Sequence, residues 1–205
     1  MRSNLDILSR SWDALSSKWL LAIGLVLLHG ILNSVIGSVG FGLGTLALSG
    51  ALSFGLSRTM VLIYRGHTPQ FETYFDGFKH FLPTLVAFLL VSVIVLLGFV
   101  LLIIPGIIAA IGLSQTFYVL QDRPELGAEG AIRESWRLTW TNGNMLKVFF
   151  MSILSALVAL GGLLALGVGL FFAIPLVSVM AGGLYEELRL AEGQTTNEEG
   201  SVEFV

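Results

Sequence analysis

Three long stretches of the chain contain no Asp, Glu, Lys or Arg. They are residues 19–57, 80–121 and 148–185, which are 39, 42 and 38 residues long. An α-helix needs about 20 apolar residues to cross the hydrocarbon core of a bilayer, so each stretch is long enough for two crossings. The pattern predicts an all-α, polytopic membrane protein whose six transmembrane helices form three hairpins.

Glycine and proline occur near the middle of each stretch, where a hairpin has to turn. The predicted turns are the four glycines between positions 37 and 44, the pair Pro105-Gly106, and Gly167-Val168-Gly169. We predict spans over residues 19–37, 43–64, 83–103, 106–121, 147–166 and 170–189.

A short amphipathic segment precedes each hairpin, with apolar side chains three or four positions apart. Trp12, Phe75 and Trp136 occupy equivalent places in these segments and are separated by 63 and 61 residues. A unit of one interfacial amphipathic helix and one hairpin therefore occurs three times, at about 3–65, 70–122 and 128–190. Because each unit contains an even number of spans, the copies share one orientation, which gives a pseudo-threefold parallel repeat.

Aromatic residues on amphipathic helices suit the headgroup layer of a bilayer. We expect such segments to form an aromatic collar at the membrane interface, although they could also be structured loops. The predicted anchors are Trp12, Phe75, Phe78, Trp136 and Trp140.

The charge pattern supports this interpretation and orients it. Charged residues make up 12% of the chain and hydrophobic residues 55%, whereas soluble domains carry about 25% charged residues. No Lys or Arg lies in the three short turns, so the positive-inside rule places both termini and both long loops in the cytoplasm. Residues 1–190 form a single integral membrane domain with nearly balanced charge, so nucleic acid is not an expected partner. Residues 191–205 are acidic and are predicted to be a disordered cytoplasmic tail.

Several motifs in the second and third units resemble a known family. They are Phe75-Asp76-Gly77-Phe78, Leu102-Ile103-Ile104-Pro105-Gly106-Ile107, Asp122-Arg123-Pro124 and the segment 131–139. Their order and spacing resemble a family of bacterial membrane proteins that groups the domain-of-unknown-function 975 proteins with the membrane domain of some glycerophosphodiester phosphodiesterases. The resemblance covers roughly residues 70–189. It implies a six-helix protein of the bacterial inner membrane, and it supplies no catalytic residues.

Polar residues within the spans are the candidates for chemistry. His29 lies in the middle of the first span with Asn33 one turn later, and Ser114 or Gln115 in the fourth span could be their partners. Such a polar cluster could pack helices together or could serve a ligand or a proton.

The residue pattern contains no catalytic or metal-binding constellation, and we expect no cofactor. The chain has no cysteine, and its three histidines are too far apart along the predicted topology to share a metal ion. An embedded enzyme would need two or more ionisable residues converging on a cavity, for which Tyr185, Glu186 and Arg189 are the nearest source.

We therefore expect a non-enzymatic protein that organises or binds membrane lipids or partner membrane proteins. The alternative is a channel or transporter for a small neutral solute, because His29, Asn33, Ser114 and Gln115 could line a path. The pattern does not indicate an oligomeric state.

Overall fold

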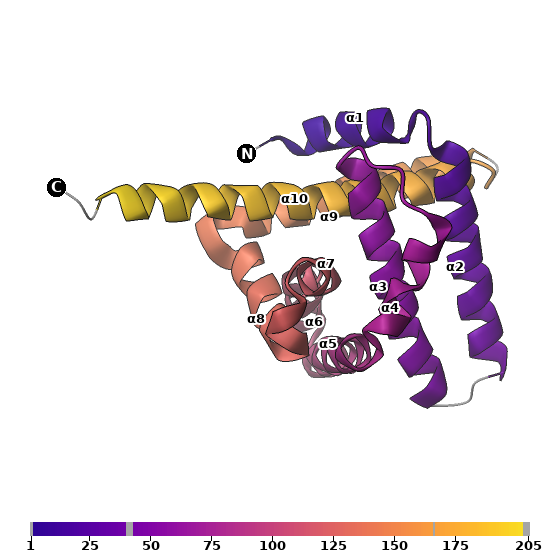
Figure 1. Ribbon diagram of the computed structural model, residues 1–205, viewed down its shortest axis with the longest axis horizontal. Helices are drawn as coiled ribbons and strands as arrows, with labels where there is room; N and C mark the ends of the chain where they lie inside the picture. Colours follow the sequence, from indigo (N-terminus) through magenta and orange to yellow (C-terminus); the bar gives the residue numbers. More distant parts are fainter. Residues whose placement is uncertain (1, 40–42, 166, 203–205) are drawn as a thin grey trace.

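The computed structural model is helical throughout the part that it describes (Figure 1). It describes the backbone of residues 2–39, 43–165 and 167–202, and the side chains of these residues except 39, 43–47, 142 and 193–202. The elements are α1 (Asn4–Leu15), α2 (Trp19–Val39), α3 (Leu43–Tyr64), η1 (Phe71–Phe75), α4 (Asp76–Lys79), α5 (Phe81–Leu101), α6 (Ile103–Gly112), α7 (Thr116–Asp122), η2 (Pro124–Leu126), α8 (Gly127–Trp140), η3 (Thr141–Gly143), α9 (Asn144–Leu164) and α10 (Leu170–Val202).

Five helical stretches within the described residues are long and apolar enough to cross a bilayer. They are Trp19–Ser38, Phe81–Leu101, Ile103–Asp122, Asn144–Leu164 and Leu170–Glu192. A shorter apolar helix, Leu48–Tyr64, lies where the sequence predicts the remaining span. The chain is thus an all-helical protein with several potential membrane-spanning helices, and their positions match the predicted spans to within a few residues.

The turns between the long helices are short. Leu102 alone separates α5 from α6 and has an extended backbone, with φ −163° and ψ 156°. Pro105 and Gly106 consequently lie inside the first turn of α6, and the turn itself comes slightly earlier than predicted. Gly167 has a φ of +76° between α9 and α10, a conformation that glycine adopts without a steric penalty. Of the glycines predicted to form the first turn, Gly40 and Gly42 lie outside the described residues.

The fourth predicted span is interrupted. Helix α6 ends at Gly112 and α7 begins at Thr116, which frees backbone groups that a continuous helix would pair. Ser135 of α8 satisfies two of them, because its hydroxyl donates to the Gly112 carbonyl at 2.8 Å and accepts from the Gln115 N–H at 3.1 Å. The break is therefore stabilised by a side chain that lies about twenty residues later in the chain.

The long helices cross one another rather than run parallel. In Figure 1, α2 and α3 run side by side down the view, α10 lies across it, and α5 and α6 are seen nearly end-on. Helix α3 contacts α2, α5, α7 and α10, so it is the hub of the packing. The helix pairs α2–α3, α5–α6 and α9–α10, which correspond to the predicted hairpins, also contact one another in a cycle. Helix α3 packs on α5, α6 packs on α9, and α10 packs on α2.

Each amphipathic segment packs on the second helix of the pair before it, so these contacts form a second cycle. Helix α1 packs on α10, η1 and α4 pack on α3, and α8 packs on α7 and α6. Each segment buries part of its apolar face there, including Ile7, Leu15 and Tyr74, which are no more than 1% exposed. The middle segment is a 3₁₀ turn followed by one α-turn rather than a continuous α-helix.

Helix α10 extends beyond the predicted sixth span, into the segment that the sequence predicts as a cytoplasmic tail. Helix α10 continues through residues 191–202. Glu192 forms ion pairs with Arg137 and, at 3.9 Å, with Arg123, so an acidic residue near the start of the predicted tail is tied to the region around α8.

Candidate functional site: a charged cluster between three helices

One arginine side chain joins three helices that are far apart in the sequence. Arg65 directly follows α3, Asp122 is the last residue of α7, and Glu186 lies on α10. The Arg65 Nη2 donates to Asp122 Oδ2 at 2.6 Å and to Glu186 Oε2 at 2.7 Å, and its Nε donates to the same Glu186 oxygen at 2.9 Å. Charge-assisted hydrogen bonds of this length are among the stronger polar contacts in proteins.

Tyr185 and Arg189 complete this group, which we call the charged cluster. The Tyr185 hydroxyl donates to Asp122 Oδ2 at 3.2 Å, and Arg189 Nη2 donates to Glu186 Oε1 at 2.7 Å. Burial alone would lower the pKa of Arg65, but hydrogen bonds and charge interactions with Asp122 and Glu186 outweigh it and raise that pKa. Arg65 is therefore a fixed positive charge.

The arrangement favours a structural role for the charged cluster over proton transfer. Tyr185, Glu186 and Arg189 do converge, together with Arg65 and Asp122. However, each carboxylate is bound by guanidinium groups, and a guanidinium is not deprotonated in the accessible pH range. The geometry can hold three helices together and can present charge at a surface.

A cavity of about 90 Å³ lies beside the charged cluster. It is lined by Arg58, Val61, Leu62, Arg65, Gln121 and Asp122, and we call it the Gln121 cavity. Arg58 Nε lies 3.2 Å from Asp76 Oδ2, and Lys79 Nζ lies 2.7 Å from Asp76 Oδ1.

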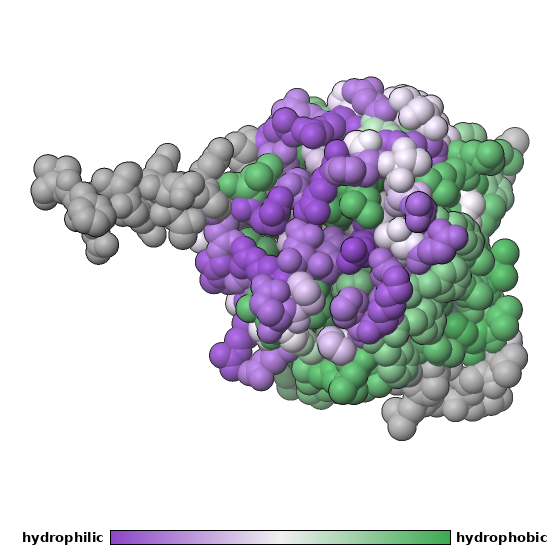
Figure 2. Space-filling model, in the orientation of Figure 1, coloured by the Kyte–Doolittle hydropathy of each residue, from purple (hydrophilic) through white to green (hydrophobic). Residues whose placement is uncertain are grey.

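Further ion pairs surround this region. Arg123 and Arg137 pair with Glu134 at 2.7 and 2.8 Å, and Arg2 pairs with Glu187 at 3.1 Å. Figure 2 shows hydrophilic residues gathered in the middle of the view, over α7, α8 and the adjoining part of α10, while hydrophobic residues cover the side formed by α2. Charged and polar side chains are therefore gathered around the charged cluster on the face that Figure 2 shows.

His29 and Asn33 are paired with residues of the first and second units. His29 Nδ1 lies 2.8 Å from the Tyr74 hydroxyl, Asn33 Nδ2 donates to the His29 carbonyl at 2.9 Å, and Ser49 Oγ donates to Asn33 Oδ1 at 3.1 Å. Burial raises the pKa of Tyr74, so its hydroxyl keeps its proton well into the alkaline range. These contacts attach the segment η1 to helix α2.

Ser114 and Gln115 form a separate set at the break between α6 and α7. Gln115 Nε2 donates to Ser114 Oγ at 2.8 Å. Among the hydrogen bonds between described residues, none joins this pair to His29 or Asn33. The four residues that the sequence suggested as one cluster thus lie in two polar sets, because Tyr74 and Ser49 supply the partners that Ser114 and Gln115 were expected to supply.

The five predicted aromatic anchors are all exposed. Trp12 is 52% exposed, and Phe75, Phe78, Trp136 and Trp140 are between 38% and 40% exposed. Trp136 and Trp140 stack with ring centroids 5.4 Å apart. The ring of Trp136 lies so close to Gly112 that a Cβ at position 112 would be 2.5 Å from the ring. These side chains are held by packing on one side and are open on the other.

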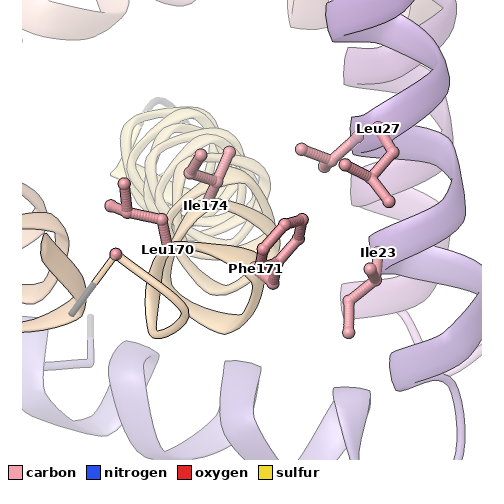
Figure 3. Close-up of a pocket in the computed structure, with 7 residues that line it drawn as sticks. Ile23, Leu27, Leu170, Phe171 and Ile174 are labelled. Carbon is pink, nitrogen blue, oxygen red and sulfur yellow. The ribbon is translucent and has the colours of Figure 1, made fainter. Parts of the chain in front are cut away.

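An apolar groove of about 220 Å³ lies between α2 and the start of α10 (Figure 3). Ile23 and Leu27 face it from α2, and Leu170, Phe171 and Ile174 face it from α10. It contains no titratable or nucleophilic side chain, so it offers contact area and no chemistry.

Sequence reasoning missed Arg58, Arg65, Gln121 and Asp122. A signal for the last three was present at the ends of the three returning helices, where Tyr64-Arg65, Gln121-Asp122 and Tyr185-Glu186 occur at similar places in each unit. Each pair consists of a large polar residue followed by a charged one, which indicates a common site if the ends converge.

The described residues contain no group of three or more His, Cys, Asp or Glu that could hold a metal ion. No family model matches the chain, and neither the curated proteins nor the solved structures give a match. The function must therefore be inferred from the chain's own residues.

Proposed function

We propose that this chain is a multi-pass protein of the bacterial inner membrane that binds lipids around its charged face and organises lipids or partner proteins there, without catalysing a reaction. The observation that carries this proposal is the aromatic collar. Its five exposed aromatic rings project from three amphipathic segments. Trp and other amphipathic aromatic side chains are favoured at this level of a membrane.

The proposed architecture has six spans in three equivalent hairpin units. The two cycles of contacts support it, because each returning helix packs on the outgoing helix of the next pair and also receives the next amphipathic segment. The charged cluster supports it as well, since Arg65, Asp122 and Glu186 come from three units and meet in one place. Membership of the family that the motifs at residues 70–189 resemble is also part of this proposal.

The proposed orientation has the charged face and both termini in the cytoplasm. Positively charged residues follow or precede the spans on the side of the charged cluster, as the positive-inside rule requires of cytoplasmic loops. The short turns at Leu102 and Gly167 then lie on the opposite side of the membrane.

Tryptophan fluorescence in lipid vesicles tests the aromatic collar. The chain has four tryptophans, and Trp19→Phe removes the one outside the collar and leaves Trp12, Trp136 and Trp140. We expect lipids brominated near the headgroup end of the acyl chain to quench this variant more strongly than lipids brominated near the chain terminus. Strong quenching by aqueous iodide, with no quenching by either lipid, would show that the collar faces water and would refute the proposal.

A further inference from the structure

The Gln121 cavity contains a buried polar side chain without a partner. Gln121 is 8% exposed, and neither its amide oxygen nor its amide nitrogen has a hydrogen-bond partner in the described structure. An unsatisfied buried amide costs free energy, because the group has lost its hydrogen bonds to water without replacing them. Because the amide has both an acceptor and donors, the group that satisfies it must supply a donor and an acceptor side by side.

The charges beside Gln121 indicate the sign of this group. Arg58 lines the cavity, and its Nε forms an ion pair with Asp76 without a hydrogen bond. Lys79 contacts the same carboxylate, so two cations share one negative charge at this edge. A guanidinium has further N–H donors on its two terminal amino groups and matches the geometry of phosphate oxygens.

The carboxylate of Asp122, which also lines the cavity, does not cancel the positive charge near Arg58. It is held by Arg65 through two hydrogen bonds, of 2.6 and 3.3 Å, and it also accepts from Tyr185. Its negative charge is therefore already matched within the charged cluster. The side of the cavity toward Arg58 keeps the positive character.

The size and position of the cavity limit what can enter. A volume of about 90 Å³ has room for several water molecules and suits a small polar group such as one phosphate with a neighbouring hydroxyl. Arg58 has a side chain that is 38% exposed, so the cavity can be reached from the surface. The exposed anchors Phe75 and Phe78 flank Asp76 in the adjoining segment.

We infer that the Gln121 cavity binds the phosphate of an anionic phospholipid headgroup. Arg58 and the Gln121 amide nitrogen donate to phosphate oxygens, and the Gln121 amide oxygen accepts from a headgroup hydroxyl. The inference deepens the proposed function and rests on it for the lipid as the source. A free phosphate ester would present the same chemistry to the same residues.

Native mass spectrometry of the detergent-purified protein tests this assignment. The probes are phosphatidylglycerol and phosphatidylcholine with identical acyl chains, and inorganic phosphate is the competitor. Both lipids carry a phosphate, but choline adds a positive charge and has no hydroxyl to donate to the Gln121 amide oxygen. We therefore expect phosphatidylglycerol to bind at least about tenfold more tightly than phosphatidylcholine. The Arg58→Gln variant should abolish this preference, while Arg133→Gln, at a 79% exposed side chain on α8, should keep it.

Gln121→Met gives a second test that keeps the length of the side chain and removes both amide groups. It should reduce the preference for phosphatidylglycerol, and it carries the test if Arg58→Gln does not yield folded protein. Competition by millimolar inorganic phosphate would support the site and show that free phosphate is accepted. Phosphate binding that Arg58→Gln removes, without any lipid preference, would assign the same site to a free phosphate ester.

An unchanged lipid preference in both variants, or equal affinity of the wild-type protein for both lipids without phosphate binding, would overturn the inference and leave water as the occupant. The brominated-lipid experiment separates this result from failure of the proposed function. If the collar is quenched as expected, the protein is a lipid-facing membrane protein whose Gln121 cavity does not select phosphate. If the collar is not quenched, the proposed function itself fails.

Discussion

Gly77 in α4 lies so close to Ala51 in α3 that a Cβ at position 77 would be 2.0 Å from the Ala51 carbonyl oxygen. One turn along α3, a Cβ on Gly55 would be 1.7 Å from the carbonyl oxygen of Tyr74. The middle amphipathic segment is thus packed backbone against backbone on α3. This contact explains why the motif Phe75-Asp76-Gly77-Phe78 contains a glycine between its aromatic residues.

Gly77→Ala should destabilise the protein, because neither backbone can move without disturbing a helix. Overpacking of this kind costs about 1–3 kcal/mol, which should appear as a lower midpoint of thermal unfolding in detergent. Gly30→Ala in α2 is the matched control, since a Cβ there meets nothing within 4 Å and alanine favours a helix. Equal midpoints for the two variants would contradict the close approach of α4 and α3.

Arg65→Gln should destabilise the fold more strongly than loss of any exposed arginine. It would deprive the carboxylates of Asp122 and Glu186, which are 18% and 13% exposed, of one cation that they share and leave them the contacts with Arg189. Removal of one partner from a buried pair costs about 3–5 kcal/mol, and partial exposure places Arg65 at the lower end. Chemical unfolding in mixed detergent measures the change.

Arg133→Gln serves as the control for Arg65→Gln. Arg133 pairs with Glu129 on the surface of α8, and both side chains are more than 70% exposed. Exposed pairs of this type contribute less than about 1 kcal/mol. If both arginine variants lose the same stability, the charged cluster does not hold the three helices together.

Ser135→Ala should weaken the junction between α6, α7 and α8. It removes the hydroxyl that bonds the Gly112 carbonyl and the Gln115 N–H, and an unsatisfied buried backbone group costs about 1–3 kcal/mol. Hydrogen exchange should increase at residues 112–116 in particular. Ser178→Ala, which removes only a bond to the carbonyl of Ile174 in its own helix, should leave exchange in that region unchanged.

The packing of α1 should depend on pH through its N-terminal capping box. Ser3 and Asp6 exchange hydrogen bonds there, and bonds from the Ser3 side chain and backbone lower the pKa of Asp6. A lowered folded pKa means that the stabilisation is complete above the unfolded value, about 3.9, and is lost as the pH falls through the folded one.

Trp12 lies on α1, so its fluorescence in a background with Trp19→Phe, Trp136→Phe and Trp140→Phe should change below about pH 4 and stay constant from pH 5 to 8. The Asp6→Asn variant should lack this change, because it has no carboxylate to protonate. A transition of the same size in Asp6→Asn would assign the pH dependence to other groups.

The sequence predicted most of the helices because uncharged length and glycine position are local properties. The interruption at residues 113–115 was missed, since Leu113, Ser114 and Gln115 carry no helix-breaking signal. Its stability depends on Ser135, whose contact exists only in the folded chain. The ion pairs of Glu192 with Arg123 and Arg137 also form only in the folded chain, so local sequence gives no signal for them.

The candidate site was harder to predict than the fold. Arg65, Asp122 and Glu186 look like unrelated residues at helix ends, and nothing in the local sequence says that they share hydrogen bonds. The sequence signal for a shared site was that the three residues occupy similar places in the three predicted units. The partner of His29 was also unpredictable from spacing, since Tyr74 reaches it from the amphipathic segment η1 and not from another long helix.

The central claim is that three helix pairs enter the membrane from one side and return to it. The chain contains no cysteine, so single cysteines can be labelled without altering the background. Ser38→Cys, Leu102→Cys and Val168→Cys place a thiol at the three turns, and Ser16→Cys, His67→Cys and Glu125→Cys place one on the side of the charged cluster. All six positions are exposed in the structure.

The most direct measurement is labelling of these variants with a membrane-impermeant maleimide in intact cells whose outer membrane has been made permeable. The account predicts that the three turn variants are labelled at once, and that the other three are labelled only after the inner membrane is opened. Labelling of Ser38→Cys and His67→Cys from the same side would show that α3 does not cross the membrane. That result would contradict the three-hairpin architecture.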